Sequence, residues 1–173
     1  MGRMSLKKVS SARGFSIIEL LIAVLIIGVI AAMAASNYFN AIHRSKQKRT
    51  MADMRSIAVA WEARAVDVKQ YNASGAAFSI PAGSVSYQEM VTMLSPTYMR
   101  TFPSADGWGF PLQFRVDQTV GAPRSAAEYA LRSPGRDGIY SSSYVDGPTT
   151  NYDCDIVYSS GQFLIYPEGV QQK

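Results

Sequence analysis

The sequence predicts an α+β fold, in which one long N-terminal helix packs against a small antiparallel sheet of about four strands. Two observations predict the helix. An uninterrupted apolar segment at residues 20–35 is followed by sequence with apolar residues at every third or fourth position, and residues 1–80 contain no proline. A third observation predicts the sheet, because short alternating polar and apolar segments, separated by turn residues, fill the C-terminal part of the chain.

Residues 1–14 form a basic leader with four Lys or Arg side chains and no acidic residue. Residues 43–49 repeat this balance, whereas residues 50–173 hold 9 basic and 12 acidic side chains. The formal charge of +4 therefore comes from the two flanks of one hydrophobic helix. This charge distribution is typical of a chain that binds a membrane, and it argues against nucleic-acid binding. Because both flanks carry four cations, the positive-inside rule leaves the orientation open.

Residues 15–36 form the membrane and assembly half of the predicted helix. The 21 residues from 15 to 35 rise about 32 Å, enough for a hydrocarbon core of roughly 30 Å. The run is too long for a typical signal-peptide core and continues into helix-compatible sequence. An ordinary membrane anchor is the alternative on pattern alone. Glu19 needs an explanation, because a carboxylate inside a membrane helix costs about 2.5–3.5 kcal/mol and is usually paired.

Residues 37–72 form the amphipathic half of the same helix. Its apolar stripe consists of Met51, Met54, Ile57, Ala58, Trp61, Ala65, Val68 and Tyr71. We expect a globular domain to pack against this stripe, and residues 72–75 to end the helix. His43 lies in the second basic cluster. We expect it in a solvated or lipid-headgroup-facing collar rather than in a metal or nucleic-acid site.

Residues 73–173 form the predicted globular domain. Residues 79–84 are expected to be a loop, and residues 87–94 a short helix that ends at Ser95 and Pro96. The glycines, proline and aspartate of residues 106–111 predict an ordered turn anchored by aromatic side chains. Strands are expected at residues 112–117, 128–133, 155–158 and 162–166, the last two forming a hairpin through residues 159–161.

A short motif opens the membrane half, where the basic leader is followed by Gly14-Phe15-Ser16-Ile17-Ile18-Glu19-Leu20-Leu21-Ile22. This motif resembles the class III signal of type IV pilins and type II secretion pseudopilins, and the resemblance covers residues 7 to about 40. It implies cleavage by a prepilin peptidase between Gly14 and Phe15, and N-methylation of Phe15. In this family, the acid at the position of Glu19 is thought to neutralise the N-terminal amine of a neighbouring subunit during filament assembly.

The resemblance also implies a location and partners. The leader would lie in the cytoplasm, and the precursor would cross the bacterial inner membrane once before joining a periplasmic or extracellular filament. The implied partners are copies of the chain itself, minor pilins or pseudopilins, the prepilin peptidase and an inner-membrane assembly platform. Met4 is a second possible start. Many relatives carry proline where this chain has Ser36, so we expect no break of the helix there.

Residues 94–116 and 129–139 more particularly resemble the major pseudopilin of type II secretion, with Gly107 in place of the usual proline. In those proteins the following loop binds calcium. The corresponding loop here, residues 134–155, holds the carboxylates Asp137, Asp146, Asp153 and Asp155. Oxygen donors on flexible loops suit structural calcium, although no EF-hand spacing is present, and Asp137 and Asp155 align best. The alternative is an acidic, solvated loop.

The sequence therefore predicts a structural subunit of a type II secretion pseudopilus. A major or minor type IV pilus subunit is the alternative within the family, and a membrane-anchored periplasmic binding domain that does not polymerise is the alternative outside it. No enzyme is expected, because the single His43 and Cys154 lie far apart in the sequence, and no catalytic triad or P-loop pattern occurs. Cys154 is the only cysteine, which excludes an intramolecular disulfide, and we expect it partly buried at a strand start.

Overall fold

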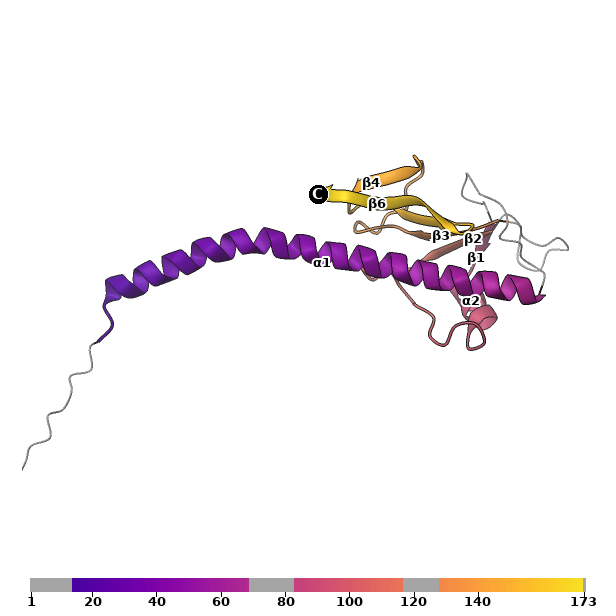
Figure 1. The fold of residues 1–173 in the computed structure, drawn as a ribbon, viewed down its shortest axis with the longest axis horizontal. Helices are drawn as coiled ribbons and strands as arrows, with labels where there is room; N and C mark the ends of the chain where they lie inside the picture. Colours follow the sequence, from indigo (N-terminus) through magenta and orange to yellow (C-terminus); the bar gives the residue numbers. More distant parts are fainter. Residues whose placement is uncertain (1–13, 69–82, 117–127, 173) are drawn as a thin grey trace, which may run out of the picture. The chain divides into compact units, whose positions relative to one another are not determined.

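The computed structural model describes residues 14–68, 83–116 and 128–172 (Figure 1). The chain divides into two compact units, Met1–Phe39 and Asn40–Lys173, and helix α1 (Ile17–Val68) contributes residues to both. The helix begins where the Ser16 carbonyl accepts hydrogen bonds from the backbone N–H groups of Glu19 and Leu20, each at 3.1 Å. It is helical at Ser36, as the absence of proline predicts. The predicted helix end at residues 72–75 lies outside the described residues.

The second unit contains a six-stranded mixed sheet, which confirms the α+β class but corrects the predicted strand number. Its strands are β1 (Gly83–Val85), β2 (Gln113–Val116), β3 (Tyr129–Ser133), β4 (Gly147–Asn151), β5 (Ile156–Ser159) and β6 (Gln162–Gln172). The spatial order is β1-β2-β3-β5-β6-β4. All neighbours are antiparallel except β4 and β6, which are parallel. The four predicted strands form β2, β3, β5 and β6.

Both strands that the sequence did not predict lie at the edges of the sheet. The end of the predicted loop at residues 79–84 forms part of β1, which pairs with β2 through Gly83↔Val116. Strand β4 contains Pro148, a residue that edge strands tolerate because one side of the strand needs no ladder bonds. Its partner β6 runs to Gln172, well past the predicted end at residue 166, and this extension makes the parallel pairing possible.

Helix α2 (Tyr87–Leu94) has the predicted bounds because its first turn is capped. The Ser86 side chain accepts a hydrogen bond from the backbone N–H of Glu89, and the Glu89 carboxylate accepts one from the Ser86 backbone N–H at 2.8 Å. This reciprocal pair is a capping box, and it satisfies two donors that a helix start leaves free. The helix buries Met90 and Leu94 against the core.

The core lies between the second part of α1, the sheet and α2 (Figure 1). From the predicted stripe, α1 buries Met54, Ile57, Ala58, Trp61 and Ala65. The Trp61 ring centroid lies 5.1 Å from that of Tyr129 on β3 and 6.5 Å from that of Phe114 on β2. Since large aromatic side chains bury the most apolar area, these contacts fix the helix on the sheet. Val68 and Tyr71 are not described at the side-chain level.

Candidate functional site

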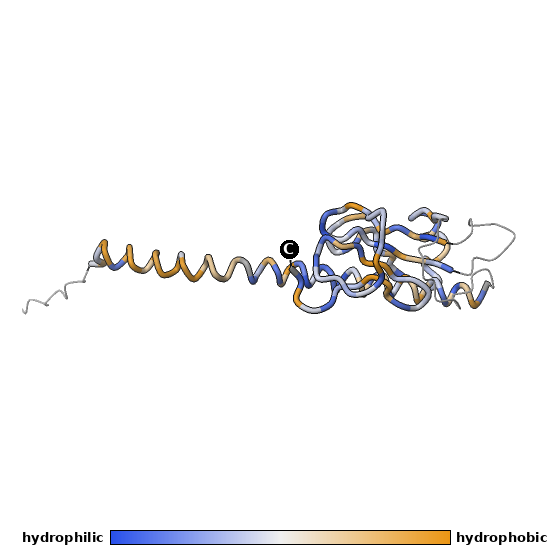
Figure 2. Tube along the Cα trace, turned by 90° about the horizontal axis from the view of Figure 1, so that it is seen from above, coloured by the Kyte–Doolittle hydropathy of each residue, from blue (hydrophilic) through white to orange (hydrophobic). Residues whose placement is uncertain are grey.

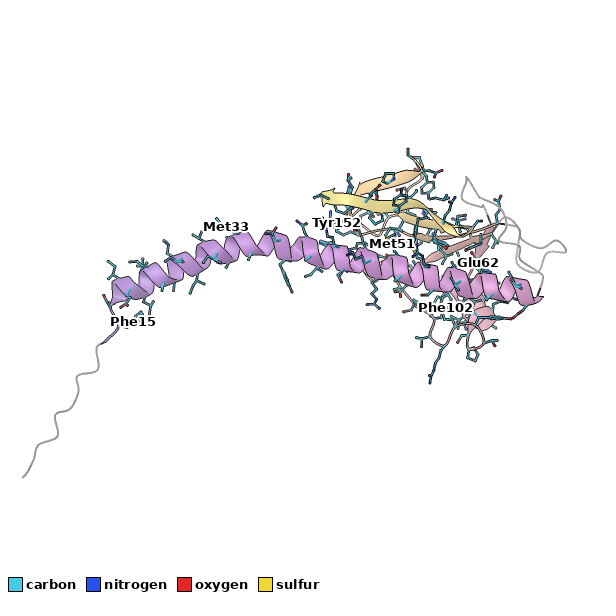
Figure 3. The ribbon with its side chains drawn as sticks, in the orientation of Figure 1. Phe15, Met33, Met51, Glu62, Phe102 and Tyr152 are labelled. Carbon is cyan, nitrogen blue, oxygen red and sulfur yellow. The ribbon has the colours of Figure 1, made fainter. Side chains whose placement is uncertain are left out.

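The membrane half of α1 exposes its apolar side chains. Between Phe15 and Met33, thirteen large hydrophobic side chains are each at least half exposed, and Ile17 is 86% exposed. An 18-residue window of α1 has a mean hydropathy of 2.9, and none of it is buried. Figure 2 shows this continuous hydrophobic stretch, and Figure 3 shows Phe15 and Met33 at either end of it. In the described residues, this is the one helix long and apolar enough to cross a membrane.

Glu19 lies in the first turn of α1, one turn after Phe15. A carboxylate there is favoured by the partial positive charge of the helix N-terminus, which is worth about 0.3–1 kcal/mol at exposed positions. Within the part of the chain that the structure describes, the Glu19 side chain forms no hydrogen bond or ion pair. The acid therefore has a preferred position on the helix but no partner within the described chain.

The turn at residues 106–111 is ordered around Asp106, a residue whose role the sequence did not predict. One oxygen of its buried carboxylate accepts hydrogen bonds from the backbone N–H groups of Trp108 and Phe110, each at 2.9 Å. The other accepts a bond from the Ser133 hydroxyl at 2.7 Å. Asp106 thus ties the turn to β3. The aspartate at a turn was the available signal, because short side chains with oxygen acceptors bond to nearby backbone N–H groups.

The same turn lies directly against α1. The Gly107 N–H donates to the Thr50 hydroxyl at 2.9 Å, and the Thr50 hydroxyl in turn donates to the Lys46 carbonyl at 3.0 Å. A Cβ on Gly107 would lie only 2.3 Å from the Lys46 carbonyl oxygen, so only glycine allows this approach. The predicted ordered turn is therefore confirmed, and Gly107 brings its backbone directly against the backbone of the helix.

His43 corrects the prediction of a solvated or headgroup-facing position. Its ring is partly buried, and its Nδ1 accepts a hydrogen bond from Trp108 Nε1 at 3.3 Å. The ring also packs on Tyr152, with centroids 5.1 Å apart, and the Tyr152 hydroxyl donates to the Asn40 carbonyl. Burial, followed by the charges of Arg136 and Lys46, lowers the pKa of His43, which favours the neutral, accepting ring. Arg44, Lys48 and Arg49 are exposed, as expected of the collar.

Asp155, one of the two best-aligned calcium candidates, is buried against an arginine. Arg132 Nε and Nη2 each lie 2.7 Å from the same carboxylate oxygen, Oδ2, which also accepts the Ser141 N–H at 3.2 Å. The Arg132 guanidinium carbon lies over the rings of Tyr140 and Tyr144, 4.6 Å from each centroid. Burial raises the pKa of Asp155, and the Arg132 charge opposes that rise. The buried ion pair between Arg132 and Asp155 thus joins strand β3 to the loop before β5.

The other candidate carboxylates do not gather around Asp155. Asp153 accepts two bonds from Arg136, at 2.6 and 2.8 Å, and Asp137 Oδ1 caps the Ile139 N–H at 2.9 Å. Asp146 is exposed in the loop before β4. Among the described residues, no group of three His, Cys, Asp or Glu side chains could hold a metal. In this arrangement the four carboxylates do not fit a calcium site, because two of them form ion pairs with arginines. Calcium binding therefore stays a prediction.

Cys154 is half-buried two residues before β5, as expected for a small residue near a strand start. Burial and the neighbouring aspartates raise the pKa of its thiol, which disfavours the reactive thiolate.

Comparison with known proteins gives two findings. Residues 9–35 match the prokaryotic N-terminal methylation motif. Three curated proteins from Dichelobacter nodosus, each a "Type IV major fimbrial protein FimA", are 41% identical over 61 residues, or 35% of this chain. This alignment spans only 38–39% of the length of those relatives. No solved structure matches the chain significantly.

Proposed function

We propose that this chain, a member of the type IV pilin and pseudopilin family, is a structural subunit of a type IV pilus. The observation that carries the proposal is the exposed apolar half of α1, whose first turn holds one acid that has no partner among the described residues. Burying one large aliphatic side chain is worth about 1.5–3 kcal/mol, so thirteen such side chains in water would cost on the order of 20–40 kcal/mol. The segment therefore needs lipid before assembly and neighbouring subunits after it.

In this proposal the inner membrane holds the precursor, with the leader in the cytoplasm. A prepilin peptidase cuts between Gly14 and Phe15, and the new N-terminal amine of Phe15 is methylated. Glu19 of one subunit then pairs with the amine of the next as the helices bundle. Two opposite charges 4 Å apart attract by about 4 kcal/mol at an effective dielectric constant of 20. The pair would set the register of neighbouring helices as well as strengthening their contact.

A second candidate is a pseudopilus subunit of type II secretion. The Asp106 turn and the strand segment at residues 129–139 favour it, since these segments resemble the major pseudopilin of that system. The relatives named above are fimbrial proteins and favour the pilus. Their similarity covers only 61 residues, and the pilin signal resembles both filament types. The assembly platform and the minor subunits would differ between the two candidates, whereas the role of α1 would not.

Mass spectrometry of sheared filaments tests the proposal. We expect a subunit that begins at Phe15, carries one methyl group on its amine and lacks residues 1–14. An intact leader on the subunits of assembled filaments would contradict it. Deleting the gene separates the two candidates. Loss of surface filaments in electron micrographs with normal protein secretion supports the pilus, and loss of secretion with normal filaments supports the pseudopilus.

A further inference from the structure

A pocket of about 260 Å³ lies between α1 and the last strand, β6, within the second unit. Its α1 wall presents Arg44 and Lys48, one turn apart on the same face of the helix. Its other lining residues are Gln47, Met51, Pro167, Gly169 and Gln171. The carboxylate nearest in sequence, Glu168, does not line the pocket. Two cations therefore face a cavity whose lining, as far as the chain is described, contains no acid.

The floor of this pocket is polar and fixed. Gln47 and Gln171 are only 4% and 7% exposed, and Gln47 Nε2 donates to the side-chain oxygen Oε1 of Gln171 at 3.2 Å. Gln171 in turn donates to the backbone carbonyls of Thr149 and Glu168, at 2.7 and 3.0 Å. The buried amides thus hold β4, β6 and α1 in one arrangement. By contrast, Arg44 and Lys48 form no hydrogen bond or ion pair with any described residue. These two cations are therefore available to bind a ligand.

The position of the pocket along α1 indicates where that partner comes from. The exposed aromatic side chains Tyr38 and Phe39 follow the apolar segment, as in the aromatic belts of membrane helices. Arg44 follows Phe39 by five residues, about 7.5 Å of helix rise. The headgroup layer on each side of a bilayer is about 5–8 Å thick, and long basic side chains reach back along their stems. Arg44 therefore lies just beyond headgroup depth while the helix spans the membrane, and Lys48 lies one helical turn farther out, about 13.5 Å of rise from Phe39.

We infer that this pocket binds a phosphate group, presented by the headgroup of an anionic phospholipid while the subunit waits in the membrane. The inference rests on the proposed function only in needing a membrane-held stage. The planar Arg44 guanidinium suits two phosphate oxygens, Lys48 supplies a second positive charge, and the neutral amide floor adds no repulsion. Each cation near an anionic lipid surface strengthens binding severalfold, so removing both is expected to weaken lipid retention roughly 30-fold.

The test uses the full-length chain in nanodiscs of phosphatidylcholine, with or without phosphatidylglycerol. After extraction into neutral detergent, native mass spectrometry counts the phosphatidylglycerol molecules retained per chain. We expect the native chain to retain one lipid, the double variant Arg44→Ala/Lys48→Ala to lose it, and the matched variant Arg49→Ala/Arg100→Ala to keep it. Equal loss in both double variants would overturn the inference, because net charge and not the pocket would then decide retention.

Two further measurements distinguish a lipid headgroup from free phosphate as the ligand, and a defect of the pocket from a defect of assembly. Titration of the chain in detergent with inorganic phosphate reports on the pocket without lipid. One outcome is that the native chain binds phosphate without retaining lipid, while Arg44→Ala/Lys48→Ala binds no phosphate. That result would support the phosphate site and assign free phosphate as its ligand. Equal phosphate and lipid binding by the native chain and that variant would overturn the site. Glu19→Ala is expected to retain lipid normally, since this test needs no filament. A chain that fails to enter nanodiscs contradicts the proposed function, and the phosphate titration then decides the pocket.

Discussion

The two halves of α1 meet the same requirement, burial of apolar side chains, in opposite ways. Trp61 and Ile57 are buried by the sheet of their own chain, at 3% and 0% exposure. Ile17 and Val24 belong to the same helix but are exposed. The second half is therefore completed by the fold, whereas in the proposed function the first half is completed by lipid or by other subunits. An exposed surface that is apolar on every side indicates such an external partner.

The largest expected effect on assembly comes from a charge placed in each half at matched exposure. Val24 and Val59 are 55% and 58% exposed in the chain. We expect Val24→Asp to weaken membrane insertion and to lower the filament yield, because an aspartate near the centre of a membrane helix costs about 2.5–3.5 kcal/mol, in addition to the cost of Glu19. Val59→Asp should insert normally, since its position faces water. Membrane fractionation measures both variants, and equal behaviour would remove the distinction between the halves.

The next effect concerns the half that the sheet covers. Trp61→Ala leaves a cavity between α1, Phe114 and Tyr129, and should destabilise the globular unit by about 3–5 kcal/mol. Val66→Ala, at a position 76% exposed, should change the free energy of unfolding by less than about 0.5 kcal/mol. Chemical denaturation of the full-length chain in detergent gives both values. A small effect at Trp61 would mean that the stripe is not the core.

A comparable loss of stability is expected when an arginine that pairs with a carboxylate of the predicted calcium loop is replaced. Arg132→Met leaves the buried Asp155 unpaired and should cost about 3–5 kcal/mol. Arg136→Met removes a pair whose side chains are 30% and 31% exposed, and should cost about 0–1 kcal/mol. Thermal unfolding should not change when a chelator is added. A large chelator shift would instead support calcium, and it would show that the carboxylates rearrange around the ion.

A smaller effect tests the close approach of the turn to α1. Gly107→Ala places a Cβ 2.3 Å from the Lys46 carbonyl oxygen, so the backbone must move, at a cost of about 1–3 kcal/mol. Gly28→Ala is the control in the membrane half, because no atom lies within 4 Å of its added Cβ. We expect the melting temperature of the globular unit to fall for the first variant and to stay constant for the second.

The features that the sequence predicted well are those set by local periodicity. The 3.6-residue stripe of α1, the bounds of α2 and the centres of β2, β3, β5 and β6 all follow from spacing and turn residues. Strands β1 and β4 were missed because one has three residues and the other carries proline. Their pairing depends on partners distant in the sequence, so no local pattern reveals it.

The features that were missed at the candidate sites are also long-range. The position of His43 against Trp108 and Tyr152 joins residues more than sixty positions apart, and a basic neighbourhood in the sequence concealed it. Likewise, the acidic composition of the loop predicted that its carboxylates bind a cation, but it did not reveal that the cations are arginine side chains. Arg132 and Arg136 lie on or just after β3, and only the fold brings their charges to Asp155 and Asp153.

The most direct test of the central claim measures filament assembly by Glu19→Ala and Glu19→Asp in cells that process the leader normally. Glu19→Ala is expected to be cut, methylated and held in the membrane, yet to yield no sheared filaments, because the amine of its neighbour lacks a counter-charge. Glu19→Asp keeps the charge on a shorter stem and should restore part of the yield. Filaments from Glu19→Ala in native amounts would contradict the account, since the exposed apolar half would then assemble without its only acid.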